Sequence, residues 1–267
     1  MSERAIGIFD SGVGGLTVFK EIERLLPGEE LVYIGDTARV PYGCKSPATV
    51  VRYALEAANF LLDQEVKMLV VACNTASSTA LPVLEERFRI PVVGVIGPGA
   101  RKAAAVTRNG RVGVIGTMAT VKSEAYTRAI HALNPDIQIF SKPCPLFVPL
   151  AEEGWGDHPV ALMVAREYLE PLAAENVDTL VLGCTHYPIL KNTLRKFLGD
   201  GVRLVDSAQE TAQTVSRLLK SDDLYRSGKP RPPRFFVTDS CENFEKVGGS
   251  FLDRRLDGVQ EIQLGFM

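Results

Sequence analysis

Short apolar runs that alternate with amphipathic stretches constrain the fold of this chain more than any other feature. The runs are apolar almost without a break, which is typical of parallel β-strands covered on both faces. They span residues 5–9, 31–35, 68–72, 92–96, 112–116, 137–140, 179–183 and 202–206. Helical patterns lie between them, among them residues 16–27, 46–63, 120–135 and 158–175. Strand and helix in alternation predict an α/β fold with mainly parallel sheets.

The order of these elements repeats along the chain. Four segments of the first half align in sequence with four of the second. The pairs are IGIFDS (6–11) with VGVIGT (112–117), LVYIGD (31–36) with IQIFSK (137–142), EVKMLVVACNT (65–75) with NVDTLVLGCTH (176–186), and IPVVGVI (90–96) with VRLVDSA (202–208). The offsets are 106, 106, 111 and 112 residues. We infer two pseudo-symmetric α/β domains that face each other, with the active site in the cleft between them.

The repeat also predicts where the domains meet. A chain of 267 residues is long enough for two domains. We place the first domain at residues 1–97 plus 207–267 and the second at residues 98–206. The helical pattern over 207–221 would then pack back on the first domain. Beyond a polar, proline-rich connector at 227–234, a strand, a helix and a strand are expected to extend the edge of the first domain.

Composition excludes several classes of function. The net charge is -2 with both signs interspersed, so neither nucleic acid nor a membrane surface is expected as the main partner. No apolar run approaches the roughly 20 residues that span a bilayer, and the start of the chain does not have the pattern of a signal peptide. The cysteine count is odd, and no CxxC pair occurs. We therefore expect no disulfide framework, no metal site and a cytoplasmic location.

Two of the apolar runs end in a cysteine that polar residues follow at once. Asn74 and Thr75 follow Cys73, and Thr185 and His186 follow Cys184, each pair leading toward a helical pattern. Ligands of parallel α/β sheets bind beyond the carboxyl ends of the strands. A helix N-terminus there favours an anion and lowers the pKa of a thiol from about 8.5.

An isolated free cysteine is usually a small buried apolar residue, and we interpret Cys44, Cys144 and Cys241 in that way. The duplication and the polar neighbours favour a chemical role for Cys73 and Cys184. Two equivalent thiols from opposed domains suit the inversion of a carbon stereocentre, in which a proton leaves one face and another arrives on the opposite face.

Other polar residues follow strands of the first domain. FDSGVGG (9–15) forms a glycine-rich turn that could hold an anion, but its spacing matches neither common nucleotide-binding motif. Asp10 is either a helix cap or the partner of Cys73. Tyr42 and Gly43 could present a hydroxyl and a backbone N–H to a ligand, while Asp36 could simply shape a turn.

Two residues of the second domain are also candidates. His186 follows Cys184 by two residues, so we predict that it is the proton partner of that thiol. Glu152 is expected on a loop, where carboxylates are usually just solvated.

The segments FDSGVGGLTV, YIGDTARVPYG, ACNTAS, VPLAEEG and LGCTHYP resemble, in this order, the glutamate racemases of the aspartate/glutamate racemase superfamily. The resemblance implies a cytoplasmic, two-domain enzyme that needs no cofactor and supplies D-glutamate for peptidoglycan. It implies that Cys73 and Cys184 are the acid/base thiols, that Asp10 and His186 assist them, and that Glu152 lies near. The implied substrate contacts are Asp10, Ser11, Tyr42, Gly43, Asn74, Thr75, Thr185 and His186. We also expect a homodimer and no N-terminal extension that binds an activator.

Three alternatives stay open at the level of sequence. A racemase of aspartate or another small acidic amino acid would share the fold and the thiols. A non-catalytic protein could hold an acidic ligand in the cleft. A thiol hydrolase could use Cys184 with His186, but it would leave Cys73 without a role.

Overall fold

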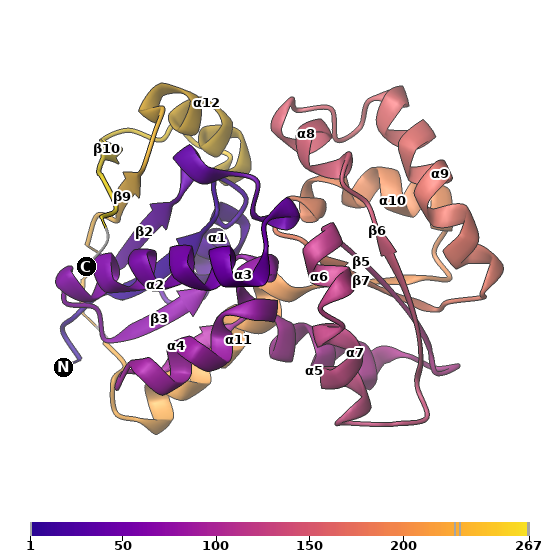
Figure 1. Cartoon of the computed structure of the whole chain (residues 1–267), viewed down its shortest axis with the longest axis horizontal. Coiled ribbons are helices and arrows are strands. Elements are labelled where there is room, and N and C mark those ends of the chain that lie inside the picture. Colours follow the sequence, from indigo (N-terminus) through magenta and orange to yellow (C-terminus); the bar gives the residue numbers. More distant parts are fainter. Residues whose placement is uncertain (1, 227, 230, 266–267) are drawn as a thin grey trace.

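The computed structural model describes residues 2–226, 228–229 and 231–265, and it contains two sheets whose strand pairs are all parallel. The first sheet has the strand order β10-β9-β2-β1-β3-β4 and the second the order β6-β5-β7-β8. The two sheets form two lobes that lie side by side (Figure 1). The predicted α/β fold with parallel sheets is therefore confirmed. Two residues of the predicted connector, 227 and 230, lie outside the described residues.

All eight predicted strands form, with ends displaced by no more than three residues. They are β1 (Ile6–Asp10), β2 (Leu31–Gly35), β3 (Met68–Val71), β4 (Val92–Gly94), β5 (Arg111–Gly116), β6 (Gln138–Pro143), β7 (Thr179–Gly183) and β8 (Arg203–Asp206). The predicted extension is also present, because β9 (Arg234–Val237) pairs with β2 and β10 (Gln260–Glu261) pairs with β9.

Strand register supports the internal repeat. The order β2-β1-β3-β4 in one sheet corresponds to β6-β5-β7-β8 in the other. Ile6 lies opposite Met68, and Val112 lies opposite Thr179, as the offsets of 106 and 111 residues require. The two halves thus match in pairing as well as in order.

The alignment of β2 with β6 is wrong by two residues. Ile6 lies opposite Leu31, but Val112 lies opposite Ile139, which corresponds to an offset of 108 instead of 106. β6 is an edge strand, and none of its residues is fully buried. A strand without a buried face carries little apolar patterning to fix its register in a sequence comparison.

Helices cover both faces of the sheets. They are α1 (Leu16–Leu25), α2 (Pro47–Asp63), α3 (Asn74–Thr79), α4 (Leu81–Arg87), α5 (Ile96–Val106), α6 (Met118–Lys122), α7 (Ala125–His131), α8 (Phe147–Glu152), α9 (Pro159–Ala174), α10 (Lys191–Leu198), α11 (Ser207–Ser221) and α12 (Cys241–Leu252). Within the described residues, no helix has the length and apolarity to cross a membrane.

Side-chain caps and breaks explain the helix ends. Ser46 caps α2 by accepting a hydrogen bond from the N–H of Thr49. The single helix predicted over 120–135 is wrong, because α6 and α7 are separated at Glu124, whose φ is 52°. The Ser123 hydroxyl bonds the backbone on both sides of this break, and such local bonds compete with helix continuation.

The hydrophobic core follows the alternation of side chains along the strands. Ile8 and Val70 point to one face of the first sheet, and Phe9 and Val71 point to the other. The cluster on the first face continues into the second lobe as far as Leu182 of β7. Helix α11 packs on α1 and also on α5, so it joins the lobes below the sheets (Figure 1). The exact domain boundaries stay a prediction.

A buried ion pair closes the end of the first sheet opposite its carboxyl edge. Lys67 Nζ, which is fully buried, donates to the Glu29 carboxylate and to the carbonyl oxygens of Ser2 and Leu224. Glu29 also accepts from the backbone N–H of Arg226. These contacts fasten the start of the chain and the segment after α11 to the sheet.

Lys67→Met is expected to lower the free energy of unfolding by about 3–5 kcal/mol, because it leaves the Glu29 charge buried without its partner. Replacing both residues, Lys67→Met with Glu29→Met, should cost less than the sum of the two single changes. Urea denaturation of the wild type, the two single variants and the double variant measures this coupling. Strictly additive losses of unfolding free energy would contradict a direct interaction between Lys67 and Glu29.

Candidate active site

The carboxyl ends of the two sheets open on one cavity of about 220 Å³ between the lobes. Every predicted site residue except Asp10 lines it, and Asp10 is fully buried beside Cys73, whose pKa its charge affects. The lining residues are Ser11, Gly12, Val40, Pro41, Tyr42, Gly43, Cys73, Asn74, Thr75, Thr117, Val148, Pro149, Glu152, Cys184, Thr185 and His186.

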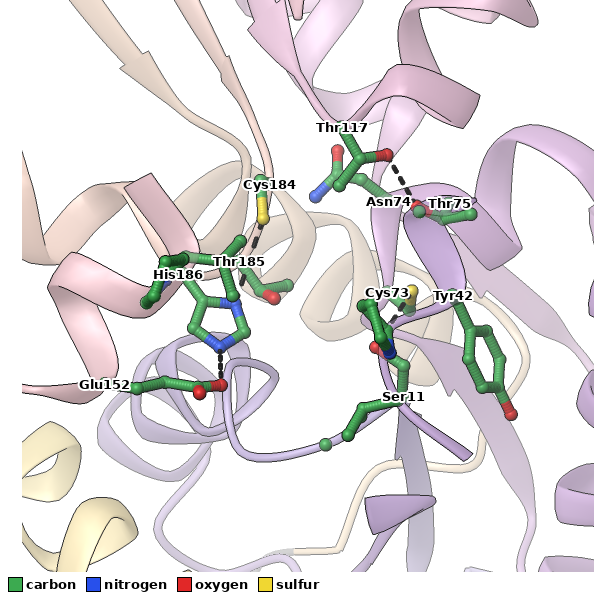
Figure 2. A pocket seen from close by; sticks show the side chains of 16 residues that line it. Ser11, Tyr42, Cys73, Asn74, Thr75, Thr117, Glu152, Cys184, Thr185 and His186 are labelled. Atoms are coloured by element: carbon green, nitrogen blue, oxygen red, sulfur yellow. Dashed lines mark hydrogen bonds and ion pairs between the residues drawn. The ribbon is translucent and has the colours of Figure 1, made fainter. Parts of the chain in front are cut away.

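Cys73 and Cys184 face this cavity from opposite lobes. Figure 2 shows Cys73 beside Ser11 on one side and Cys184 beside His186 on the other. The Cys73 side chain caps α3, and its Sγ accepts from the N–H of Ala76 at 3.5 Å. Cys184 follows β7 directly, and its Sγ lies 3.8 Å from His186 Nδ1. Both thiols therefore reach one small volume.

His186 bridges Cys184 and a carboxylate. Its Nε2 lies 2.9 Å from Glu152 Oε1 (Figure 2). Burial, the largest effect, disfavours the charged ring, but hydrogen bonds to Cys184 and Glu152 and their negative charges raise the pKa of His186 to about 10. With this pKa, the His186 ring is a cation at neutral pH. The loop location predicted for Glu152 is wrong, because this residue ends helix α8.

Cys73 has a different environment. Burial, followed by the charge of Asp10, raises the pKa of the Cys73 thiol to about 12. The Ala76 N–H and the Ser11 hydroxyl act in the opposite direction without cancelling this rise. The lowered pKa predicted from the helix N-terminus is therefore wrong for this thiol, because desolvation exceeds the effect of the backbone donor. Burial also raises the pKa of Asp10, whose Oδ2 accepts from the Gly12 N–H.

Tyr42 lines the cavity but does not offer its hydroxyl proton to a ligand. That hydroxyl donates to Asp36, which also accepts from Arg39 and Thr238. Asp36 is fully buried at the end of β2. It therefore does more than shape a turn, because it anchors the segment that carries Gly43 to the rim of the cavity.

Asn74 and Thr75 meet residues of the opposite lobe. Asn74 Oδ1 accepts from the Tyr126 hydroxyl at 2.8 Å, while its buried Nδ2 has no partner among the described residues. Thr75 Oγ1 lies 2.9 Å from Thr117 Oγ1. The sequence prediction missed Thr117, although the internal repeat aligns it with Ser11 and could have identified it. The apolar rim residues Val40, Pro41, Val148 and Pro149 carry no comparable signal.

This arrangement can exchange protons at a carbon held between two sulfurs. One side supplies a neutral thiol, and the other supplies a sulfur next to an imidazolium. An unpaired buried amide donor faces the same cavity, as required for binding an anionic group. Among the described residues no cluster of three or more His, Cys, Asp and Glu side chains is arranged to hold a metal ion.

Comparison with known proteins agrees with this geometry. The sequence model of the Asp/Glu/Hydantoin racemase family matches residues 6–215. The glutamate racemase of Geobacter metallireducens is 56% identical over 265 residues, which cover 99% of this chain and 98% of that protein. That of Syntrophus aciditrophicus is 51% identical over 260 residues, covering 97% and 96%.

Solved structures are equally similar. A glutamate racemase isoform from Bacillus anthracis superposes with a TM-score of 0.96 at 41% identity and covers 99% of both chains. Glutamate racemase from Francisella tularensis, solved in complex with D-glutamate, gives a TM-score of 0.93 at 41% identity with the same coverage. The chain has two parallel-sheet lobes and a cysteine from each lobe at one cavity, and a family model matches most of its length. Together with these relatives, this shows that the chain belongs to the Asp/Glu/Hydantoin racemase family.

Proposed function

We propose that this chain interconverts L- and D-glutamate without a cofactor, with Cys73 and Cys184 as the two acid/base groups. The observation that carries the proposal is the position of two cysteines at equivalent strand tips of two lobes, both facing one cavity. A racemase needs one group on each face of the α-carbon. A hydrolase that used only Cys184 and His186 would leave the matching thiol unexplained.

Each turnover moves two protons. One sulfur, as thiolate, removes the α-proton and gains an S–H bond. The electron pair of the broken C–H bond spreads into the α-carboxylate, where hydrogen-bond donors stabilise the developing charge. The opposite thiol then gives its proton to the other face of the carbon and becomes a thiolate. The two sulfurs exchange protonation states, so the same site runs the reaction in both directions.

The environments of the two thiols assign their starting states. With a pKa near 12, Cys73 holds its proton at neutral pH and begins as the acid. His186 Nδ1 lies 3.8 Å from the Cys184 sulfur as its proton partner, and we assign Cys184 as the initial base. The ammonium group of the bound amino acid adds a positive charge between the sulfurs, and that charge favours the thiolate at Cys73 when its turn comes.

Polar groups on the cavity wall suit a substrate with two carboxylates. We propose that the substrate carboxylates bind the Asn74 amide, the hydroxyls of Ser11, Thr75 and Thr185, and the backbone at Gly43. Burial and the charge of the buried Asp10 raise the pKa of Cys73, and the Tyr42 ring forms part of the cavity wall. Glutamate is preferred over aspartate because the close relatives are glutamate racemases. An aspartate racemase homologue from Pyrococcus horikoshii is only 15% identical and shares the fold alone.

We also propose that the enzyme supplies D-glutamate for peptidoglycan, works in the cytoplasm and forms a homodimer. These statements rest on the resemblance to glutamate racemases. The five cysteines are all free, in keeping with a reducing compartment. Sedimentation velocity tests the dimer, and a concentration-independent monomer would refute it.

Cys73→Ser and Cys184→Ser should each lower kcat for glutamate racemisation by about 10²–10⁴, because a serine hydroxyl is a poor acid/base group and such groups contribute that range. Circular dichroism of L-glutamate with purified enzyme and no added cofactor measures the rate. Cys241→Ser, a thiol outside the cavity, serves as the control and should keep wild-type activity. Wild-type rates in either cavity variant would refute the mechanism, and glutamate binding without any racemisation by wild type would favour a binding protein.

Glu152→Gln should move the alkaline limb of the kcat/KM pH profile to lower pH. The negative charge of Glu152 helps to raise the pKa of His186, so its removal lets the ring lose its proton at lower pH. Glu153→Gln, the adjacent exposed carboxylate, is the matched control and should leave the limb in place. An unchanged limb in Glu152→Gln would show that His186 does not set it.

A further inference from the structure

We propose that Tyr126 is a positioning residue that aims the N–H donors of Asn74 at the substrate, an inference that rests on the proposed function. Tyr126 lies on α7 in the second lobe, and Asn74 begins α3 in the first. Both side chains are 2% exposed. The tyrosine does not line the cavity, so its effect on substrate passes entirely through Asn74.

The hydrogen bond from Tyr126 selects one orientation of the amide. A carboxamide has an acceptor on one side and two donors on the other. The Tyr126 hydroxyl donates to Asn74 Oδ1 at 2.8 Å, which turns Nδ2 away from the tyrosine. In Figure 2 the Asn74 amide lies at the cavity between Thr117 and Cys184. Its Nδ2 is buried and finds no acceptor among the described residues, so an anionic ligand in the cavity would satisfy it.

The chemistry of the two partners determines the direction of this bond, because an amide oxygen can only accept and the phenol must therefore donate its proton. Burial raises the pKa of Tyr126, so the phenol keeps that proton throughout the neutral range. The hydrogen bond therefore runs from the Tyr126 hydroxyl to the Asn74 amide oxygen.

Two glycines hold the ring in place. A Cβ on Gly183 would lie 3.1 Å from Cε2 of Tyr126, and one on Gly99 would lie 3.2 Å from Cε1. The ring is thus packed closely against backbone that carries no side chains, and it has little freedom to move away from Asn74. Because donor and acceptor belong to different lobes, the amide is aimed only while the lobes stay together.

The test combines Tyr126→Phe with Asn74→Ala. Tyr126→Phe leaves the amide oxygen without its donor whenever Nδ2 faces the substrate, so KM and the Kd for D-glutamate should rise about tenfold or more. The fall in kcat should be smaller, since neither thiol is touched. In the Asn74→Ala background the same change should have no further effect on KM or Kd. Tyr168→Phe, which removes a hydroxyl of the same lobe that accepts from the Leu146 N–H outside the cavity, should leave both constants unchanged.

Calorimetric Kd values keep this result separate from the proposed function. An unchanged KM and Kd in Tyr126→Phe, or an undiminished effect in the Asn74→Ala background, would overturn the positioning role while wild-type racemisation stands. A wild type that binds glutamate but does not racemise it would overturn the proposed function, and the Kd comparison would still decide the role of Tyr126. Equal losses of melting temperature in Tyr126→Phe and Tyr168→Phe, with a rise in KM for the former alone, support the assignment.

Discussion

The close approach of the two lobes at Gly14 is the contact on which the site depends. A Cβ at this position would come within 2.4 Å of the His186 ring and of Thr185 Oγ1. Without that atom the imidazolium lies near enough to Asp10 for its charge to lower the pKa of the carboxyl group, against the larger effect of burial. The residues that the two lobes contribute to the site therefore interact electrostatically as well as lining one cavity. Any side chain at this position would have to displace the His186 ring and the Thr185 hydroxyl or separate the lobes beside the cavity.

Although the fold is duplicated, its two cavity thiols have different neighbouring ionisable residues. The repeat aligns Asp10 with Gly116 and Thr75 with His186. One sulfur consequently has a buried carboxylate nearby and the other has an imidazole, although both occupy the same place on their strands. Identical surroundings would give both thiols the same starting state. In the proposed mechanism, the different residues at these equivalent positions separate an initial acid from an initial base within a nearly symmetric frame.

The sequence predicted the parts of this structure that depend on local pattern. Buried strands carry continuous apolar runs, so their positions and the cysteines at their tips were predictable. The edge strand β6 lacks that signal, and its alignment was two residues out. The pKa of Cys73 and the proposed role of Tyr126 depend on burial and on contacts between lobes, which no local pattern contains. Thr117 is an intermediate case, because no local pattern marks it but the internal repeat aligns it with the predicted site residue Ser11.

The position of deuterium after racemisation in D₂O tests the central claim most directly. If opposed sulfurs act on one carbon, the base removes the proton from one face and a solvent-exchanged thiol on the other face supplies deuterium. At early times the product enantiomer should then carry deuterium at Cα while the recovered starting enantiomer stays protiated, in both directions of the reaction. Deuterium in both enantiomers at equal rates, read by NMR and mass spectrometry, would mean that a single base serves both faces and would contradict the account.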